Sequence, residues 1–302
     1  MAIETEFNEL VGEQTATRAT RQAVARPMLR ASSIYLLVTY AVLVVAGFVA
    51  MVPFLYVIST SLKETIALFH YPPEWIPHEP TLVNYKDLIR EHPWLRWTLN
   101  SFIVAASVTV IKVVIDSMAG YAFAKMRFPG KDALFLLVLL TLMVPFAATL
   151  LPLYIIVREL HLTNNYLGLI LPPLASPIGI FMMRSFIESL PNDLENAARL
   201  DGCSELQVYR RVILPLIRPG LVVLGVFTFM NQWTSYLWPL VIGTKAEMFT
   251  LTVGVQSLRS LFTVNWGILS AGAVMSMLPL VIVFIFLQRY FIAGSIAGAL
   301  KE

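Results

Sequence analysis

Long stretches without charged residues alternate with short polar segments along this chain. Five stretches carry no Asp, Glu, Lys or Arg: residues 31–62, 133–157, 162–183, 219–244 and 260–288. A sixth, residues 97–124, is apolar apart from Lys112 and Asp116. Each reaches the ~20 residues that a helix needs to cross a bilayer core. The pattern therefore predicts an all-α membrane protein with six transmembrane helices.

The six predicted spans leave little of the chain outside the membrane. They cover approximately residues 34–60, 97–124, 133–156, 164–184, 219–242 and 267–289. Residues 1–31 are polar and are expected to form a tail, and residues 32–302 form the six-span domain. Prolines within the third and fourth spans predict kinks, because proline removes a bond from the helical ladder. These prolines are Pro145, Pro152, Pro172, Pro173 and Pro177.

The composition agrees with a membrane protein and excludes other classes. Hydrophobic residues make up 57% of the chain and charged residues 14%, whereas soluble domains contain ~25% charged residues. The net charge of +3 is too small to indicate a nucleic-acid-binding protein. The single cysteine, Cys203, excludes a disulfide framework within the chain and a multi-cysteine metal site.

The distribution of basic residues predicts the orientation. The N-terminal tail, the second-to-third and fourth-to-fifth loops and the C-terminal end carry about twice as many Lys and Arg residues as the opposite side. Because basic residues favour the cytoplasmic side, we expect both termini to be cytoplasmic. The segment Thr244–Trp266 is then expected to form a surface loop on the outer side.

The predicted cytoplasmic loop, residues 184–218, contains signals for two short helices. Asn192–Leu200 is rich in helix formers, and Pro191 suits a first turn. Gly202 supplies the left-handed residue that commonly ends a helix. Ser204–Gln207 matches a capping box that starts another helix. The loop is therefore predicted to form a helix, a glycine turn and a second helix.

This loop has two interpretations from its chemistry. Ala197 and Ala198 leave one face of the first helix narrow, so that the helix could lie in a groove of a partner protein. Alternatively, the loop is amphipathic and lies on the lipid surface.

The spacing in this loop resembles the EAA motif of permease subunits of binding-protein-dependent ABC importers. Asn196–Ala198, Gly202 and Val212–Pro215 fall at the motif's positions. Asn196 stands where the motif has its Glu, and Val212 where it has Ile. The neighbouring Glu195 is expected to supply the missing charge.

Further segments resemble the maltose-type, sugar-importing branch of this family, in the order in which that branch carries them. Ala119–Ala124 and Phe128–Lys131 resemble its second cytoplasmic turn. Trp233–Leu240 resembles its fifth span, with Thr234 where Asn is usual, and Asn265–Gly267 resembles the start of its sixth.

The resemblance implies the type I ABC importer permease fold and one half of a pore in the plasma (inner) membrane of a bacterium or archaeon. The implied partners are a second, different permease, a dimer of ATPase subunits, an extracytoplasmic sugar-binding protein and membrane lipid. ATP and Mg²⁺ would be bound by the ATPase, and this chain would bind no cofactor and catalyse no reaction. In agreement, Gly130 and Lys131 lack the earlier glycine of a phosphate-binding loop. The residues assigned to ATPase coupling are Pro191, Glu195, Asn196, Ala197, Ala198, Arg199, Asp201, Gly202, Leu214 and Pro215.

Two groups of polar residues fall within predicted spans. Lys112 and Asp116 lie on one helix face, either as a gating pair or, as we favour, as a structural ion pair. The fifth span carries amide, hydroxyl and aromatic side chains that suit a sugar pathway, or that pack between helices. These candidate pathway residues are Asn231, Gln232, Trp233, Thr234 and Tyr236.

Two other classes of protein are considered. A secondary transporter or channel would have no use for an ATPase-docking loop, and it would need a relay of charges across the spans. An intramembrane enzyme is disfavoured because the four histidines form no H-E-x-x-H pair and no G-x-S-x-G occurs. We therefore expect no catalytic and no metal-binding residues.

Overall fold

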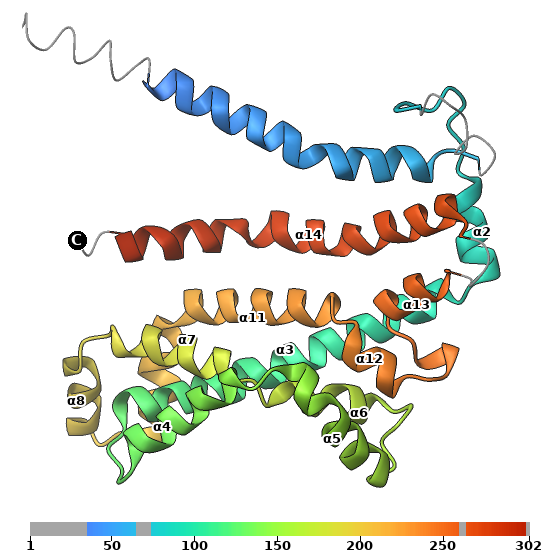
Figure 1. Ribbon diagram of the computed structural model, residues 1–302. Helices are drawn as coiled ribbons and strands as arrows, with labels where there is room; N and C mark the ends of the chain where they lie inside the picture. The colour runs from blue at the N-terminus through green and yellow to red at the C-terminus, as the bar shows by residue number, and fades with distance from the viewer. Residues whose placement is uncertain (1–34, 65–73, 260–263, 300–302) are drawn as a thin grey trace, which may run out of the picture. The chain divides into compact units, whose positions relative to one another are not determined.

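The computed structural model describes residues 35–64, 74–259 and 264–299 (Figure 1). The predicted tail, residues 1–31, lies outside the described residues. The chain divides into two compact units, Met1–Tyr56 and Val57–Glu302. The described part of the first unit belongs to the helix Tyr35–Ser61, whose side chains there are mostly exposed and predominantly apolar, as expected of a helix that faces lipid.

The second unit is organised around one long helix, α3 (Trp94–Lys125). Helix α7 (Pro177–Glu188) and helix α11 (Arg218–Trp233) both pack against α3 (Figure 1). The close approach to α7 depends on Gly120, because a Cβ there would lie 2.7 Å from the Cβ of Met183. Helix α3 contributes buried side chains to all three hydrophobic clusters of this unit.

The predicted third and fourth spans are each broken at proline. Helix α4 (Lys131–Leu140), with the short η2 (Thr141–Met143), is bent by 99° from α5 (Phe146–Glu159). Pro145 sits at this break with extended backbone angles. Helix α6 (Tyr166–Ile170) and η3 (Pro172–Leu174) are bent by 47° from α7. The predicted kinks are confirmed at these breaks, whereas Pro152 lies inside α5 without interrupting it.

The last two predicted spans correspond to α11 with the short α12 (Leu237–Ile242) and to part of α14 (Trp266–Ala299). The predicted fifth span, residues 219–242, is two helices, because α11 ends at Trp233 and α12 follows. The predicted sixth span, residues 267–289, lies within α14, whose apolar portion Trp266–Phe286 is long enough to cross a membrane. Within the described residues, three helices are long and apolar enough to cross a membrane, or up to six if each bent pair is one span.

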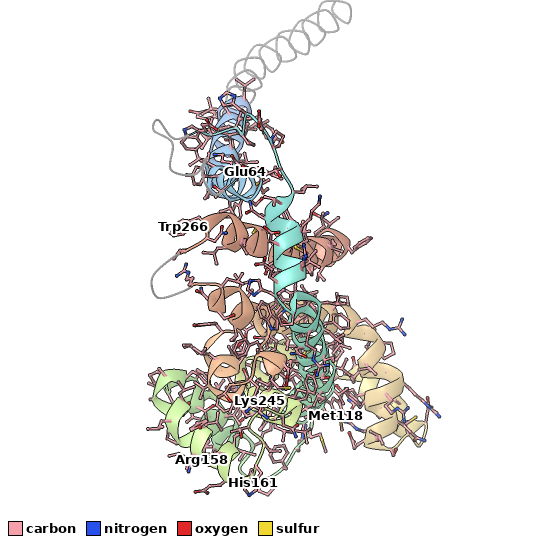
Figure 2. All side chains as sticks on the ribbon, turned by 90° about the vertical axis from the view of Figure 1, so that its right-hand side faces the viewer. Glu64, Met118, Arg158, His161, Lys245 and Trp266 are labelled. Atoms are coloured by element: carbon pink, nitrogen blue, oxygen red, sulfur yellow. The ribbon has the colours of Figure 1, made fainter. Side chains whose placement is uncertain are left out.

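Shorter elements complete the second unit. Helix α2 (Val83–Glu91) precedes α3, and η5 (Ala246–Met248) and α13 (Leu251–Ser257) lie between α12 and α14. The segment Thr244–Trp266 is therefore no plain surface loop, since its helix α13 buries Leu251 and Val253. In Figure 2 the labelled Arg158, in the last turn of α5, lies beside His161, which follows the helix and whose amide donates to the Arg158 carbonyl at 3.0 Å.

Candidate docking loop and transport cavity

The segment between α7 and α11 folds as two short helices around a glycine turn, as predicted. Helix α8 (Asp193–Leu200) is followed by α9 (Glu205–Val208), the π-helical turn η4 (Tyr209–Ile213) and α10 (Leu214–Leu216). Pro191 was expected in the first turn of α8, but this expectation is wrong, because the helix begins two residues later. Pro215 lies within α10, just before the chain bends by 79° into α11.

The turn between α8 and α9 has the geometry that its sequence predicts. Gly202 adopts a left-handed φ of +81°, and the Cys203 amide donates to the Ala198 carbonyl at 3.0 Å. Ser204 and Gln207 form the predicted capping box, in which the Ser204 amide donates to the Gln207 side chain at 2.8 Å. Asp201 at this turn is exposed.

Lys125, the last residue of α3, anchors the start of α8. Its ammonium group donates to the Leu190 carbonyl and to Oδ1 of Asn192, both at 2.6 Å, and lies 3.3 Å from Oε1 of Glu195. The side chains of Lys125 and Glu195 are only 5% and 2% exposed. From the sequence, Lys125 counts only as a loop charge, because nothing local indicates a partner 70 residues away.

Glu195 does not have the role that the sequence suggested for it. It was expected to supply a charge to a partner in place of the Glu missing at position 196. Instead, its carboxylate is buried against Lys125 and accepts from Nη2 of Arg199 at 3.1 Å. Asn196 is exposed, and its Oδ1 lies 3.5 Å from Nη1 of Arg199. The exposed position of the motif therefore carries a neutral amide.

Arg199 joins the two loop helices. Its Nε donates to Oε1 of Glu205 at 2.8 Å, and the hydroxyl of Tyr121 on α3 donates to Oε2 of Glu205 at 2.7 Å. These hydrogen bonds, led by that from Arg199, lower the pKa of the Glu205 carboxyl. A further hydrogen bond, 2.7 Å long, joins Ser117 of α3 to Tyr209. The loop is thus held to the end of α3 by a connected set of polar contacts.

One face of α8 remains open to solvent. Asn196 and Ala197 are exposed, and Leu200 is 88% exposed. Ala198 is buried, so only Ala197 belongs to the narrow outer face that was expected to contain both alanines. Asn196, Ala197 and Leu200 are hereafter called the α8 outer face. A single exposed leucine is common on protein surfaces, so this face is open to a partner but does not by itself identify one.

The candidate pathway residues of the fifth span separate into two groups. Asn231, Gln232 and Tyr236 line a cavity of about 470 Å³. Trp233 is 3% exposed and packs in the core, where its indole Nε1 donates to the Ser276 carbonyl at 3.1 Å. Thr234 is exposed and its hydroxyl donates to the Met230 carbonyl of its own helix. The other lining residues are Phe146, Pro172, Pro173, Ala175, Ser176, Ser235, Leu237 and Trp238.

Lys112 and Asp116 form a buried ion pair that joins α3 to α7. The ammonium lies 2.8 Å from Oδ2 of Asp116 and donates to the Ser176 carbonyl, at the start of α7, at 3.0 Å. The two side chains are 6% and 1% exposed. Asp116 packs against Gly179, where a Cβ would lie 1.8 Å from Oδ2. This geometry supports the structural interpretation of the pair.

The chain thus combines apolar helices that are bent at prolines, a loop between α7 and α11 that is anchored to α3, and a cavity with polar lining residues. A family model described as "Binding-protein-dependent transport system inner membrane component" matches residues 116–294. The chain belongs to this family, and it is an inner-membrane permease subunit of ABC importers. In such importers a second permease, ATPase subunits that hydrolyse ATP and a substrate-binding protein are separate components.

Individual relatives agree with this assignment. The chain is 39% identical to the arabinooligosaccharides transport system permease protein AraQ of Halalkalibacterium halodurans, over 84% of this chain and 92% of that protein. It is 35% identical to the sulfoquinovosyl glycerol transport system permease protein SmoH of Agrobacterium fabrum, over 82% and 88%. A bacterial ABC transporter involved in the import of the acidic polysaccharide alginate matches with a TM-score of 0.77 at 23% identity, over 87% of this chain and 98% of that one. The fold is therefore that of a type I importer permease.

Proposed function

We propose that this chain forms one half of the pore of an ATP-driven sugar importer. Its partners in this proposal are a different second permease, an ATPase dimer that binds ATP and Mg²⁺, and an extracytoplasmic sugar-binding protein. The functions after which AraQ and SmoH are named, arabinooligosaccharide and sulfoquinovosyl glycerol transport, support a sugar or sugar derivative as cargo. The amide and aromatic groups around the cavity suit such a cargo.

The coupling role is assigned to the loop Arg184–Arg218. The observation that carries it is the anchoring of α8, whose inner side is fixed to Lys125 while the α8 outer face stays exposed. An ATPase that moves this outer face must also move the end of α3. ATP binding then shifts the pore between inward-facing and outward-facing states, because the ATPase binds the two states with different affinity.

The test uses the complete importer. The chain is coexpressed with a second permease and the ATPase, purified, reconstituted in liposomes with its binding protein, and assayed for ATP-dependent sugar uptake. Recovery of the ATPase with the chain and uptake that requires ATP support the proposal. Uptake by a complex that lacks any ATPase would instead indicate a secondary transporter or channel.

Replacement of Gly202 by Val tests the loop itself. A β-branched residue at φ +81° costs about 1–2 kcal/mol in backbone strain and should distort the turn between α8 and α9. We expect the complex to assemble but uptake to be lost. Gly130→Val is the matched control, since Gly130 has a φ of +76° and, like Gly202, has no atom within 4 Å of the point that a Cβ would occupy. Normal uptake by the Gly202 variant would contradict the coupling assignment.

A further inference from the structure

The cavity beside α11 is lined without a charged group. Its polar lining comes from the side chains of Asn231, Gln232, Ser176, Ser235 and Tyr236, and aromatic and aliphatic residues complete it. A volume of about 470 Å³ lies within the ~300–1,000 Å³ typical of small-molecule sites. The cavity is therefore large enough for a sugar ring and offers it only neutral partners.

The two amides of this lining are available to a ligand. Within the part of the chain that the structure describes, the side chains of Asn231 and Gln232 make no hydrogen bond to another protein group. Each amide offers two donor hydrogens and one acceptor oxygen, the combination that sugar hydroxyls require. Trp233 and Thr234, their neighbours on the chain, have their polar groups bonded to backbone carbonyls.

A paired charge borders the space next to the cavity. Ser176, Asn231 and Gln232 also line a narrower space of about 90 Å³ whose wall includes Lys112. The Lys112 ammonium lies 2.8 Å from Asp116 and 3.0 Å from the Ser176 carbonyl. An unpaired ammonium in such a poorly solvated wall would attract anions. The ion pair of Lys112 and Asp116 has no net charge and therefore does not attract them.

We propose that this cavity binds an uncharged sugar ring, and that Asp116 sets this preference by neutralising Lys112 beside Asn231 and Gln232. This inference rests on the proposed function and narrows its substrate class. It separates this chain's cargo from the anionic cargoes after which some relatives are named, such as the sulfonate sulfoquinovosyl glycerol and sn-glycerol-3-phosphate. Here Asp116 acts through Lys112 and is a positioning residue.

Charged thiol reagents test the neutrality of the cavity directly. In a Cys203→Ser background, which removes the only cysteine of this chain, Gln232→Cys is compared with the control Thr234→Cys, which lies outside the cavity. The assembled importer is labelled with an anionic and with a cationic methanethiosulfonate of similar size. The rate for each reagent is measured on this chain by intact mass.

We expect the anionic-to-cationic rate ratio at Gln232→Cys to match the control within about twofold. Adding Asp116→Asn should raise this ratio on the order of fivefold or more, as one unpaired charge nearby requires, and leave the control unchanged. If the Asp116 variant does not assemble, Lys112→Gln leaves Asp116 unpaired and should shift the ratio in the opposite direction. A high ratio already in the parent, unchanged by these substitutions, overturns the inference.

Protection from labelling tests the ligand class. Leu237→Cys places the thiol in the cavity wall and leaves both amides intact. Neutral monosaccharides, including arabinose and glucose, should slow labelling at least about threefold, and glucuronic acid, a ring of similar size that carries a carboxylate, should not at equal concentration. Replacing Asn231 and Gln232 by Ala should remove the protection. No protection by any neutral sugar, or stronger protection by glucuronate, overturns the inference. Either result leaves the proposed function standing, because that function is tested separately by the uptake assay.

Discussion

Replacing Lys125 by Met should release α8 from α3. Methionine keeps an unbranched apolar side chain of similar length but removes the ammonium. Three contacts disappear: the two hydrogen bonds to Leu190 and Asn192 and the ion pair with Glu195. The Glu195 carboxylate, 2% exposed, then keeps Arg199 as its ionic partner.

The expected destabilisation by Lys125→Met follows from the burial of the ion pair between Lys125 and Glu195. Removing one member of a buried ion pair costs about 3–5 kcal/mol, because the other charge stays uncompensated. Arg199 is 35% exposed and still contacts Glu195 at 3.1 Å, so we expect the lower end, about 3 kcal/mol. At ~1.4 kcal/mol per tenfold change, local opening of α8 should become on the order of 100-fold more frequent.

Hydrogen–deuterium exchange of the α8 peptide in the assembled importer measures this opening. The matched control is Lys131→Met, because among the described residues the Lys131 ammonium donates to the Ala124 and Met126 carbonyls and to no group of α8. The double variant Lys125→Met with Glu195→Met should regain most of the protection, since an apolar pair leaves no buried charge. Unchanged exchange in the Lys125 variant, or a double variant that exchanges as fast as the single one, would refute the reasoning.

Two further predictions concern the buried pair and the loop. Gly179→Ala should lower the thermal midpoint of the purified complex by the equivalent of about 1–3 kcal/mol, because the new Cβ overlaps Asp116. The control Gly225→Ala should not lower it, because the nearest atom to its new Cβ lies 3.6 Å away. A lowered midpoint in both variants would contradict this explanation. Hydrogen bonds from Arg199 and Tyr121 lower the pKa of Glu205 in the folded loop. The stability that the Glu205 charge provides is therefore fully present above the ordinary pKa of a glutamate, ~4.3, and is lost as the pH falls through the lowered folded-state pKa. Loop protection in hydrogen exchange should therefore stay constant from pH 7 to about 5, and a loss above pH 5 would contradict this assignment.

The parts of the structure that local sequence determines were predictable. Gly202 and the capping box of Ser204 and Gln207 act within a few residues, so their turn could be predicted. The breaks at Pro145 and just before Pro177 were predictable for the same reason. The size of each bend was not, because it depends on which neighbouring helices accept the free backbone groups.

Contacts between distant segments could not be predicted. The partners Lys125 and Glu195 are far apart in sequence, and only the packing of α7 and α3 brings them together. Helix α13 was expected to be part of a surface loop, yet Gly254 lets it contact Trp97 of α3, where a Cβ would lie 2.2 Å from the indole. The sequence shows an apolar tryptophan and a glycine but no signal that they meet. For the same reason the sequence left open whether Trp233 lines a pathway or packs between helices, and the structure places it in the core.

The arrangement of α3 explains how the docking loop and the cavity can act together. Helix α3 is a continuous element that runs from Trp94 to Lys125, whereas α4 and α5, and α6 and α7, are broken by bends. Its Lys112 lines the narrower space beside the cavity and its Lys125 holds α8, and 13 residues of helix separate the two lysines by about 20 Å. An unbroken helix of this length transmits a displacement of its end, and the contacts at Lys112 and Asp116 tie that displacement to the start of α7. In the proposed coupling, a force applied to the α8 outer face would therefore reach the cavity through α3, without a need for any ionisable relay across the membrane.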